Sequence, residues 1–430
     1  MILRFGVENF RSFRDRAELS FVSTARKDEP ALRFPTSGTP HGVLPVVGLW
    51  GANASGKSNL LAALVGMQNA VAMSFVGLSP DQEVPWIPWR MMTAMGAPPT
   101  KMDLDILVGG VRHHYGFRFD SRGFSEEWLY AWPGRARRVL FHRNHADADP
   151  WYFGPSLKDA RRIVKATRPN SLFLSAAAQH NHKSLKSVYG AITGGLIAVP
   201  ALKSEGHPLF RPGSAILDPG NRTMLLAALA AADLDVRSVR EVERHDETVL
   251  LKVQQSLTRD PQLASLVAEL DATGPLRELW FTHGASGESG WEVPPPLESR
   301  GTHAFLHRFD VLLQILSDGV LWIADELDQS LHPDLCRELI RLFTDPATNR
   351  HGAQLLFATH QRDLLTTLRT DEVLLVEKDR DGASSLRAAS DFRELRTRDD
   401  LRRAHEQGRV GGVPVLGDLG AALSGSGSVS

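Results

Sequence analysis

The sequence holds one cysteine and lacks both long apolar runs and internal repeats. Cys336 alone cannot form an internal disulfide, which fits a reducing compartment. No apolar stretch approaches the length that spans a bilayer, and the chain opens on a strand-like pattern rather than a signal peptide. We therefore expect a cytoplasmic protein without a membrane partner.

An excess of charge of either sign is also absent. The 49 Lys and Arg residues balance 50 Asp and Glu residues, and the formal net charge is -1. This balance excludes a global basic field that would attract nucleic acid, although it leaves a local basic face open. With 430 residues, of which 42% are hydrophobic, the chain is typical of a globular protein with more than one lobe.

The strongest motif is a glycine-rich loop between a strand-like and a helix-like segment. The apolar residues 44–50 are followed by Gly51-Ala52-Asn53-Ala54-Ser55-Gly56-Lys57-Ser58-Asn59, which has the spacing G-x-x-x-x-G-K-S. Gly51 and Gly56 let the backbone turn tightly, so that consecutive N–H groups and a helix N-terminus point at an anion. Lys57 is suited to the β- and γ-phosphates of a nucleotide, and Ser58 to Mg²⁺. The alternative is an ordinary glycine turn before a helix, which the full pattern disfavours.

A second set of candidate residues follows two strand-like segments far along the chain. The apolar residues 320–324 end in Asp325 and Glu326, and residues 355–358 end at Thr359 and His360. Asp325 is predicted to hold Mg²⁺, Glu326 to orient and deprotonate water, and His360 to donate a hydrogen bond to the γ-phosphate. Solvated acids and a structural histidine are the alternatives, and the upstream phosphate loop counts against them.

In this order, the phosphate loop, the Asp-Glu strand, Asp328 and His360 resemble ABC-class ATPase heads of the RecF, SMC and OLD branch. The resemblance implies ATP and Mg²⁺ as ligands, Arg11 near the nucleotide, and a homodimer or higher oligomer that closes around ATP. In that class a signature motif of one subunit caps the nucleotide of the other. Here residues 298–302 contain Ser299 and Gly301 ahead of an apolar helix and resemble a divergent signature. The alternative for Ser299 is an ordinary helix N-cap.

A closer resemblance rests on three weaker strings, residues 7–13, 325–333 and 408–414. These resemble the RloA-like and AriA-like prokaryotic defence ATPases. That resemblance implies an ATP-hydrolysing switch that controls a nuclease-like effector protein in anti-phage defence. The resemblance covers residues 1 to about 418. It also implies that the effector is a separate chain.

The expected fold class is α/β. Strand-like and helix-like segments alternate after residue 276, which indicates a parallel sheet, and short strands between 104 and 142 indicate an antiparallel β lobe. By resemblance this is an ABC-type ATPase head with a mixed sheet core and an inserted, mainly helical lobe. The predicted parts are 1–150 (first part of the head), 151–275 (inserted lobe), 276–418 (second part of the head) and 419–430 (flexible tail).

Three local expectations within this fold depend on short patterns. Residues 183–197 have helix-like spacing, and the run before Gln179 is strand-like. Residues 239–243 and 249–253 are candidates for a strand pair.

Other functions stay open at this point. A RecF-like DNA-binding repair ATPase is the main alternative, followed by a transport ATPase and by a binding-only scaffold. Arg135, Arg137 and Arg138 lie near Trp128 and Trp132 in a small basic and aromatic cluster. Such a cluster either contacts nucleic acid phosphates or forms a solvated face.

Overall fold

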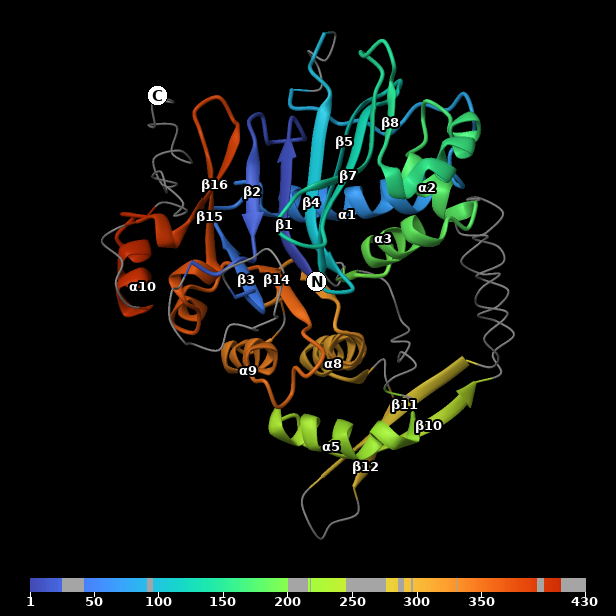
Figure 1. Cartoon of the computed structure of the whole chain (residues 1–430). Helices are drawn as coiled ribbons and strands as arrows, with labels where there is room; N and C mark the ends of the chain where they lie inside the picture. Colours follow the sequence, from blue (N-terminus) through green and yellow to red (C-terminus); the bar gives the residue numbers. More distant parts are fainter. Residues whose placement is uncertain are drawn as a thin grey trace. The chain divides into compact units, whose positions relative to one another are not determined.

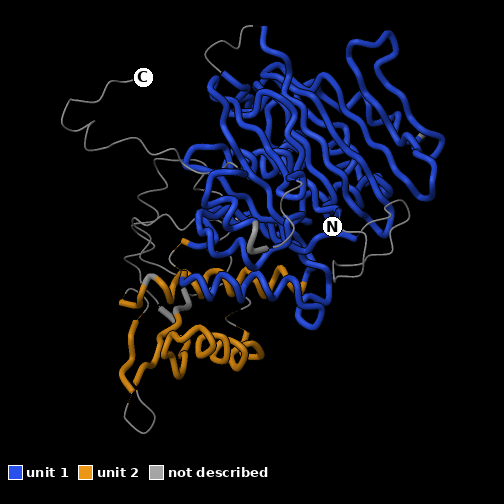
Figure 2. Tube along the Cα trace, turned by 90° about the vertical axis from the view of Figure 1, so that its left-hand side faces the viewer, with its two compact units in different colours: residues 1–201, 318–328, 332–430 blue, residues 202–317, 329–331 orange. Residues whose placement is uncertain are grey.

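The structure is a computed structural model that describes residues 1–24, 42–90, 96–199, 216, 218–244, 276–284, 290–294, 297–329, 331–392 and 398–410. The chain divides into two units, which Figure 2 colours separately. Unit 1 holds residues 1–201, 318–328 and 332–430, and unit 2 holds residues 202–317 and 329–331. Unit 2 therefore begins later than the inserted lobe predicted at 151–275.

A seven-stranded antiparallel sheet forms the first layer of unit 1 (Figure 1). Its strands alternate between buried apolar residues on one face and mainly polar residues on the other, as a half-buried sheet requires. This sheet is the predicted antiparallel β lobe. In spatial order the strands are β2 (Ala17–Ser20), β1 (Ile2–Glu8), β4 (Thr100–Val108), β5 (Val111–Asp120), β6 (Gly123–Trp132), β7 (Arg138–Asn144) and β8 (Trp151–Phe153).

A six-stranded mixed sheet forms the core of unit 1. Five of its strands are parallel, and β16 is an antiparallel edge strand. The parallel strands β3, β13 and β14 are buried at every residue, which explains their continuous apolar runs. The expected α/β fold with a mixed sheet core is thereby confirmed. In spatial order the strands are β16 (Ser384–Ala388), β15 (Val373–Lys378), β3 (Val46–Trp50), β14 (Gln354–Ala358), β13 (Leu321–Ala324) and β9 (Leu196–Val199).

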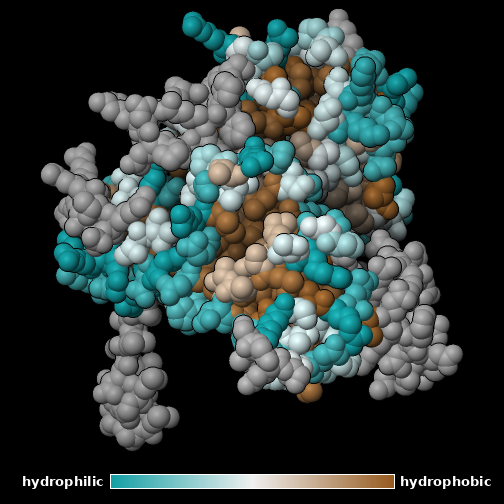
Figure 3. Space-filling view, turned by 90° about the horizontal axis from the view of Figure 1, so that it is seen from below, coloured by the Kyte–Doolittle hydropathy of each residue, from teal (hydrophilic) through white to brown (hydrophobic). Residues whose placement is uncertain are grey.

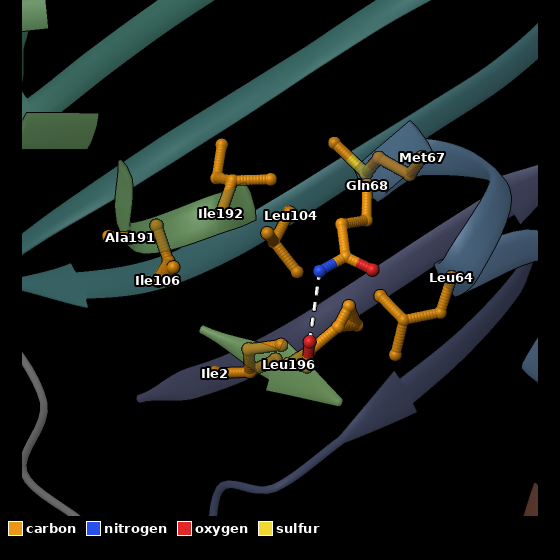
Figure 4. Close-up of a pocket in the computed structure, with 9 residues that line it drawn as sticks. All are labelled: Ile2, Leu64, Met67, Gln68, Leu104, Ile106, Ala191, Ile192 and Leu196. Carbon is orange, nitrogen blue, oxygen red and sulfur yellow. Dashed lines mark hydrogen bonds between the residues drawn. The ribbon is translucent and has the colours of Figure 1, made fainter. Parts of the chain in front are cut away.

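The helix α1 (Lys57–Met73) follows β3 and packs against the seven-stranded sheet. Leu64 and Met67 of α1 lie near Leu104 of β4 in Figure 4. The amide of Gln68 donates hydrogen bonds to the carbonyls of Thr193 and Leu196, at 2.7 and 2.9 Å. A polar side chain of α1 thus holds the beginning of β9 in place.

The remaining helices of unit 1 are short. They are η2 (Pro155–Ala166), α2 (Phe173–Gln179), α3 (Lys183–Thr193), α9 (Pro333–Thr344), η5 (Arg362–Thr366), η6 (Thr370–Glu372), η7 (Ala389–Asp391) and α10 (Arg398–Glu406). Among the described helices of the chain, none combines the length and the hydropathy needed to span a membrane. Viewed from below, Figure 3 shows hydrophobic residues exposed among hydrophilic ones.

Unit 2 is built from a three-stranded antiparallel sheet and helices. Strand β10 (Val236–Arg244) pairs with β11 (Leu276–His283), which pairs with β12 (Trp291–Val293). The helix α5 (Arg222–Ala231) follows η3 (Pro219–Asn221) and buries Leu225 and Leu229. The long helix α8 (Arg300–Asp318) begins in unit 2.

Two local expectations were wrong, and a third falls partly outside the described residues. The helix predicted at 183–197 ends at Thr193, because Leu196–Val199 pairs with β13 as the strand β9. The strand-like run before Gln179 is the helix α2. The predicted strand pair of 239–243 with 249–253 is not tested, because residues 249–253 lie outside the described residues, and within these β10 pairs with β11. Tertiary contacts overrode the local pattern in the two contradicted cases.

Candidate active site

The phosphate loop joins the carboxyl end of β3 to the first residue of α1. Gly56 precedes the helix with a φ angle of 119°, which side chains rarely adopt. A Cβ atom at Gly56 would lie 2.4 Å from Ser384 Oγ, and one at Gly51 would lie 2.4 Å from the carbonyl oxygen of Val376. Both positions of the motif therefore require glycine in this fold.

Lys57 lies folded over this loop. Its ammonium group donates hydrogen bonds to the carbonyls of Gly51, at 2.7 Å, and Ala52, at 3.1 Å. Burial lowers the pKa of Lys57, and the charges of three nearby carboxylates (Asp325, Glu326 and Asp328) oppose that shift. The lysine is thus a cation held within the electrostatic field of the acidic residues that follow β13.

The first turn of α1 carries the other loop residues. Ser58 and Asn53 are exposed at the surface of the loop, and Asn59 is partly buried. Because the first N–H groups of a helix have no acceptor within the helix, they remain available to an anion. Ser58, the predicted magnesium ligand of this motif, therefore faces solvent, whereas Lys57 is buried.

Hydrogen bonds from two distant segments hold the loop. Ser384 of β16 donates from Oγ to the carbonyl of Ser55 at 2.5 Å and from its N–H to the carbonyl of Ser12 at 2.7 Å. Asn59 donates from Nδ2 to Ser12 Oγ at 2.9 Å, and Arg11 Nη1 lies 3.5 Å from Asn59 Oδ1. Arg11 thus lies beside the loop, and its predicted place near the nucleotide stays a prediction. Sequence reasoning missed Ser384, because its partner Ser55 is far away in the chain.

The acidic pair follows β13, and β14 lies between β13 and β3. Asp325 is partly buried and Glu326 is exposed, with a φ angle of 52° at Glu326. The N–H of Leu327 donates to the carbonyl of Ala358 at the end of β14, at 3.1 Å. That bond ties the acidic segment to the strand that precedes His360.

His360 lies in the same electrostatic field. Partial burial lowers the pKa of its imidazole, and the charge of Lys57 lowers it further. Asp328, Glu326 and Asp325 oppose that shift. The side chains of Lys57, the three acids and His360 are therefore close enough to influence one another, as expected where the carboxyl ends of parallel strands meet.

Several buried side-chain oxygen atoms have no hydrogen-bond partner within the described part of the chain, and two of them belong to Asp328 and to the residue after His360. These two are Asp328 Oδ1 and Gln361 Oε1. Unpaired buried oxygens of this kind are costly, and a bound ligand or water is the usual remedy. Together with the cationic loop, they fit a phosphate ligand that carries a divalent cation. Gln361 was not among the residues predicted from the sequence.

A groove of about 770 Å³ opens beside the loop. Arg11, Ser58 and Asp325 line one part of it, and apolar side chains line the rest. Its volume lies within the range of ordinary small-molecule pockets. All of its lining residues belong to unit 1.

The predicted signature residues lie in unit 2. Ser299 Oγ accepts a hydrogen bond from the N–H of Thr302 at 3.0 Å, so Ser299 caps α8, and Gly301 lies in the first turn. The N–H of Ser299 donates to Glu298 Oε2, and Glu298 Oε1 lies 2.5 Å from His283 Nε2. Ser299 is therefore a helix N-cap, as the alternative interpretation expected. A contact of Ser299 with the nucleotide of another subunit stays a prediction.

The phosphate loop, the acids after β13 and His360 after β14 define a site of the P-loop ATPase class. The chain belongs to the protein family described as "AAA domain, putative AbiEii toxin, Type IV TA system", whose model matches residues 46–366. The matched segment includes every predicted site residue except Arg11. A comparison with curated proteins gives no match.

Three solved structures show a distant likeness. The SMC head domain from Thermotoga maritima is 12% identical with a TM-score of 0.39, covering 90% of this chain and 98% of that one. The SMC head bound to the C-winged helix domain of ScpA is 15% identical with a TM-score of 0.40, covering 90% and 97%. An SMC head with an extended coiled coil, bound to the C-terminal domain of ScpA from Pyrococcus furiosus, is 13% identical with a TM-score of 0.35, covering 95% and 99%. The family assignment rests on the sequence match rather than on these structures.

Proposed function

We propose that the chain binds ATP with Mg²⁺, hydrolyses it to ADP and phosphate, and uses this cycle to control a partner protein. The observation that carries the proposal is the electrostatic coupling of Lys57, the acids after β13 and His360. A phosphate loop alone is compatible with binding only, whereas this coupling supplies the groups that hydrolysis needs.

Each side chain has a distinct role in this proposal. Lys57 exchanges the carbonyls of Gly51 and Ala52 for phosphate oxygens, and the N–H groups of the loop bind the β-phosphate. Ser58 and Asp325 hold Mg²⁺, which neutralises phosphate charge when bound. Asn53, Asn59 and Arg11 line the nucleotide.

The chemical step depends on groups at the ends of β13 and β14. Glu326 orients water and accepts its proton. His360 donates a hydrogen bond from a neutral imidazole, which agrees with its lowered pKa. In the dimer closed around ATP, Asp328 contacts the bound ligand through Oδ1, which has no hydrogen-bond partner among the described residues.

The proposed assembly is a homodimer or higher oligomer that closes around ATP. Ser299 and Gly301 at the start of α8 contact the nucleotide of the other subunit, since a helix N-terminus favours an anion. This part of the proposal is supported by the resemblance to ABC-class heads. The domain parts 1–150, 151–275, 276–418 and 419–430 and a cytoplasmic location belong to the same proposal.

The partner that we propose is a nuclease-like effector in prokaryotic anti-phage defence. The family description names a putative toxin and a type IV toxin–antitoxin system, which supports a role in controlling a toxic activity. The resemblance to RloA-like and AriA-like ATPases supports the defence context. Nucleic acid is not required for this control, since the proposed output is carried by a protein.

A Glu326→Gln substitution tests the catalytic step. It removes the proton acceptor and keeps the shape, so we expect ATP turnover to fall by about 10²–10⁴-fold while ATP binding is retained. Phosphate release and nucleotide binding are measured on the same preparation. The control is Glu338→Gln on the exposed face of α9, which should leave turnover intact. Full turnover in Glu326→Gln would show that Glu326 is not the base.

The Glu326→Gln variant, which binds ATP without hydrolysing it, also tests whether the chain controls a partner protein. Glu326→Gln, held with ATP and Mg²⁺, is purified from cells that carry the neighbouring genes. A stoichiometric protein with nuclease character supports the proposed switch. If no protein copurifies in stoichiometric amounts, the effector part of the proposal is wrong even where hydrolysis is confirmed.

A further inference from the structure

The outer face of the seven-stranded sheet carries a row of aromatic residues on β6. Side chains alternate along a strand, so Trp128, Tyr130 and Trp132 point to one face. Successive members of this row are about 6.8 Å apart along the strand. The intervening residues Leu129 and Ala131 are buried on the opposite face. The row therefore lies on the face opposite the apolar core, where Trp128 is itself buried and Tyr130 and Trp132 are partly exposed.

A cation lies over each ring of this row. Lys101 Nζ lies 5.5 Å from the Trp128 ring centroid. The guanidinium carbons of two arginines lie 4.8 Å from Tyr130 (Arg137) and 4.6 Å from Trp132 (Arg112). Such contacts order a long cationic side chain before any ligand binds. Binding an anion to that side chain then costs little further conformational entropy. The result is a line of ordered cationic side chains, of which Arg112 is also paired with Asp105.

Acidic residues on the same face are engaged in ion pairs. Asp105 pairs with Arg112 at 2.6 Å and with His114 at 2.8 Å. Glu126 pairs with Arg118 and His142 in the same way, at 2.9 and 3.1 Å. The carboxylates therefore neutralise the middle of the face and leave the cations at its margins.

Four cations of this sheet have no carboxylate partner among the described residues, although Arg138, which pairs across the strands with Ala131, belongs to the opposite face. They are Lys101 at the start of β4 and Arg135, Arg137 and Arg138 in and beside the turn between β6 and β7. The three arginines are exposed. The three arginines thus concentrate positive charge at the β6–β7 end of the sheet, although the whole chain is close to neutral. Lys101 lies toward the other end, opposite Arg118 of β5.

We propose that this outer face binds single-stranded nucleic acid. The unpaired cations contact backbone phosphates, and bases stack on the exposed guanidinium of Arg137 and on the partly exposed Trp132 ring. Guanidinium planes and aromatic rings both accept stacked bases, and a single strand can turn its bases toward a sheet in a way that a duplex cannot. The choice between DNA and RNA is an outcome of the test, because phosphates and stacking are common to both.

The test measures binding of labelled single-stranded DNA and RNA of mixed sequence by fluorescence anisotropy, without nucleotide. The variant replaces Arg135, Arg137 and Arg138 by alanine together. We expect affinity to fall about tenfold or more. The slope of log affinity against log salt should become shallower by about 0.7 for each phosphate that the variant no longer neutralises. Omitting ATP separates this result from any failure of the ATPase proposal.

Two further variants sharpen the result. Arg122→Ala removes an arginine with an 88% exposed side chain at the opposite end of the same sheet, where it pairs with Asp120, and should bind as the parent does. Arg137→Lys keeps the charge and loses the planar group, so affinity should fall while the salt slope is kept. Circular dichroism melting of each variant checks that the sheet is folded.

Several outcomes overturn the proposal. Absence of binding by the parent chain at low salt does so, as does unchanged affinity in the triple variant or an equal loss in Arg122→Ala. Equal affinity for duplex and single strands would contradict the stacking of bases. If the triple variant loses affinity as expected, the proposal is supported. A preference of the parent chain for DNA or for RNA then identifies the ligand.

Discussion

At the scale of single residues, the phosphate loop depends on a backbone conformation that only glycine adopts readily. Gly56 has a φ angle of 119°, and an added Cβ would lie 2.4 Å from Ser384 Oγ. Sequence reasoning predicted the glycine from its spacing in the motif. It could not predict Ser384, since no local pattern marks a serine whose hydroxyl binds a carbonyl 329 residues away.

A Gly56→Ala substitution should abolish nucleotide binding. The side chain forces the loop out of position, so we expect ATP affinity to fall by more than about tenfold and the melting temperature to decrease. Isothermal titration and thermal melting measure the two effects. The matched control is Gly190→Ala in the middle of α3, where no heavy atom lies within 4 Å of the added Cβ. There we expect a gain of about 0.5–1 kcal/mol in the free energy of unfolding.

The pKa of His360 is a second test at this scale. Burial and the charge of Lys57 lower it, and the acids after β13 raise it. We expect the imidazole to titrate below its ordinary value of 6.5. Lys57→Met should raise the pKa by removing a positive charge, whereas Asp328→Asn should lower it further by removing a negative one. NMR titration of the ring protons measures each value. If the pKa of His360 shifted in the opposite direction in both variants, the charges of Lys57 and Asp328 would not act on the imidazole as described.

At the scale of elements, long-range contacts decided what the sequence pattern left ambiguous. The apolar residues 196–199 continue the helix-like spacing of α3, but pairing with β13 makes them a strand. The run at 173–178 looks like a strand, but the N–H groups of Phe173 and Leu174 donate to the carboxylate of Glu127, which favours a helix start. The parallel strands were predictable because continuous burial leaves an unambiguous apolar run.

Glu127 should therefore be a major contributor to stability. It is fully buried and lies 3.2 Å from the buried Arg143, and it also accepts a hydrogen bond from Tyr115. Glu127→Gln leaves the Arg143 charge without a counter-ion, so we expect the free energy of unfolding to fall by about 3–5 kcal/mol. Denaturant unfolding followed by circular dichroism measures the change. The neighbouring Glu126→Gln, on the partly exposed face, should cost about 1 kcal/mol or less. Equal costs would contradict the importance of burial.

At the scale of the whole molecule, the proposed ATP-bound dimer predicts a change of mass. Glu326→Gln with ATP and Mg²⁺ should double the mass measured by light scattering after gel filtration, and Lys57→Ala should not change it. ADP should leave both variants unchanged, since closure depends on the γ-phosphate. A dimer that forms equally without nucleotide would contradict closure around ATP.

The order of strands in the six-stranded sheet has a consequence for biosynthesis. The strand that carries the phosphate loop, β3, pairs on its two sides with β14 and β15, which are translated some 300 residues later. A ribosome has therefore made most of the polypeptide before β3 gains either neighbour, while β1, β4 and β5 can already pair with one another. A nascent chain thus cannot complete the sheet around the phosphate loop until β14 and β15 have been made.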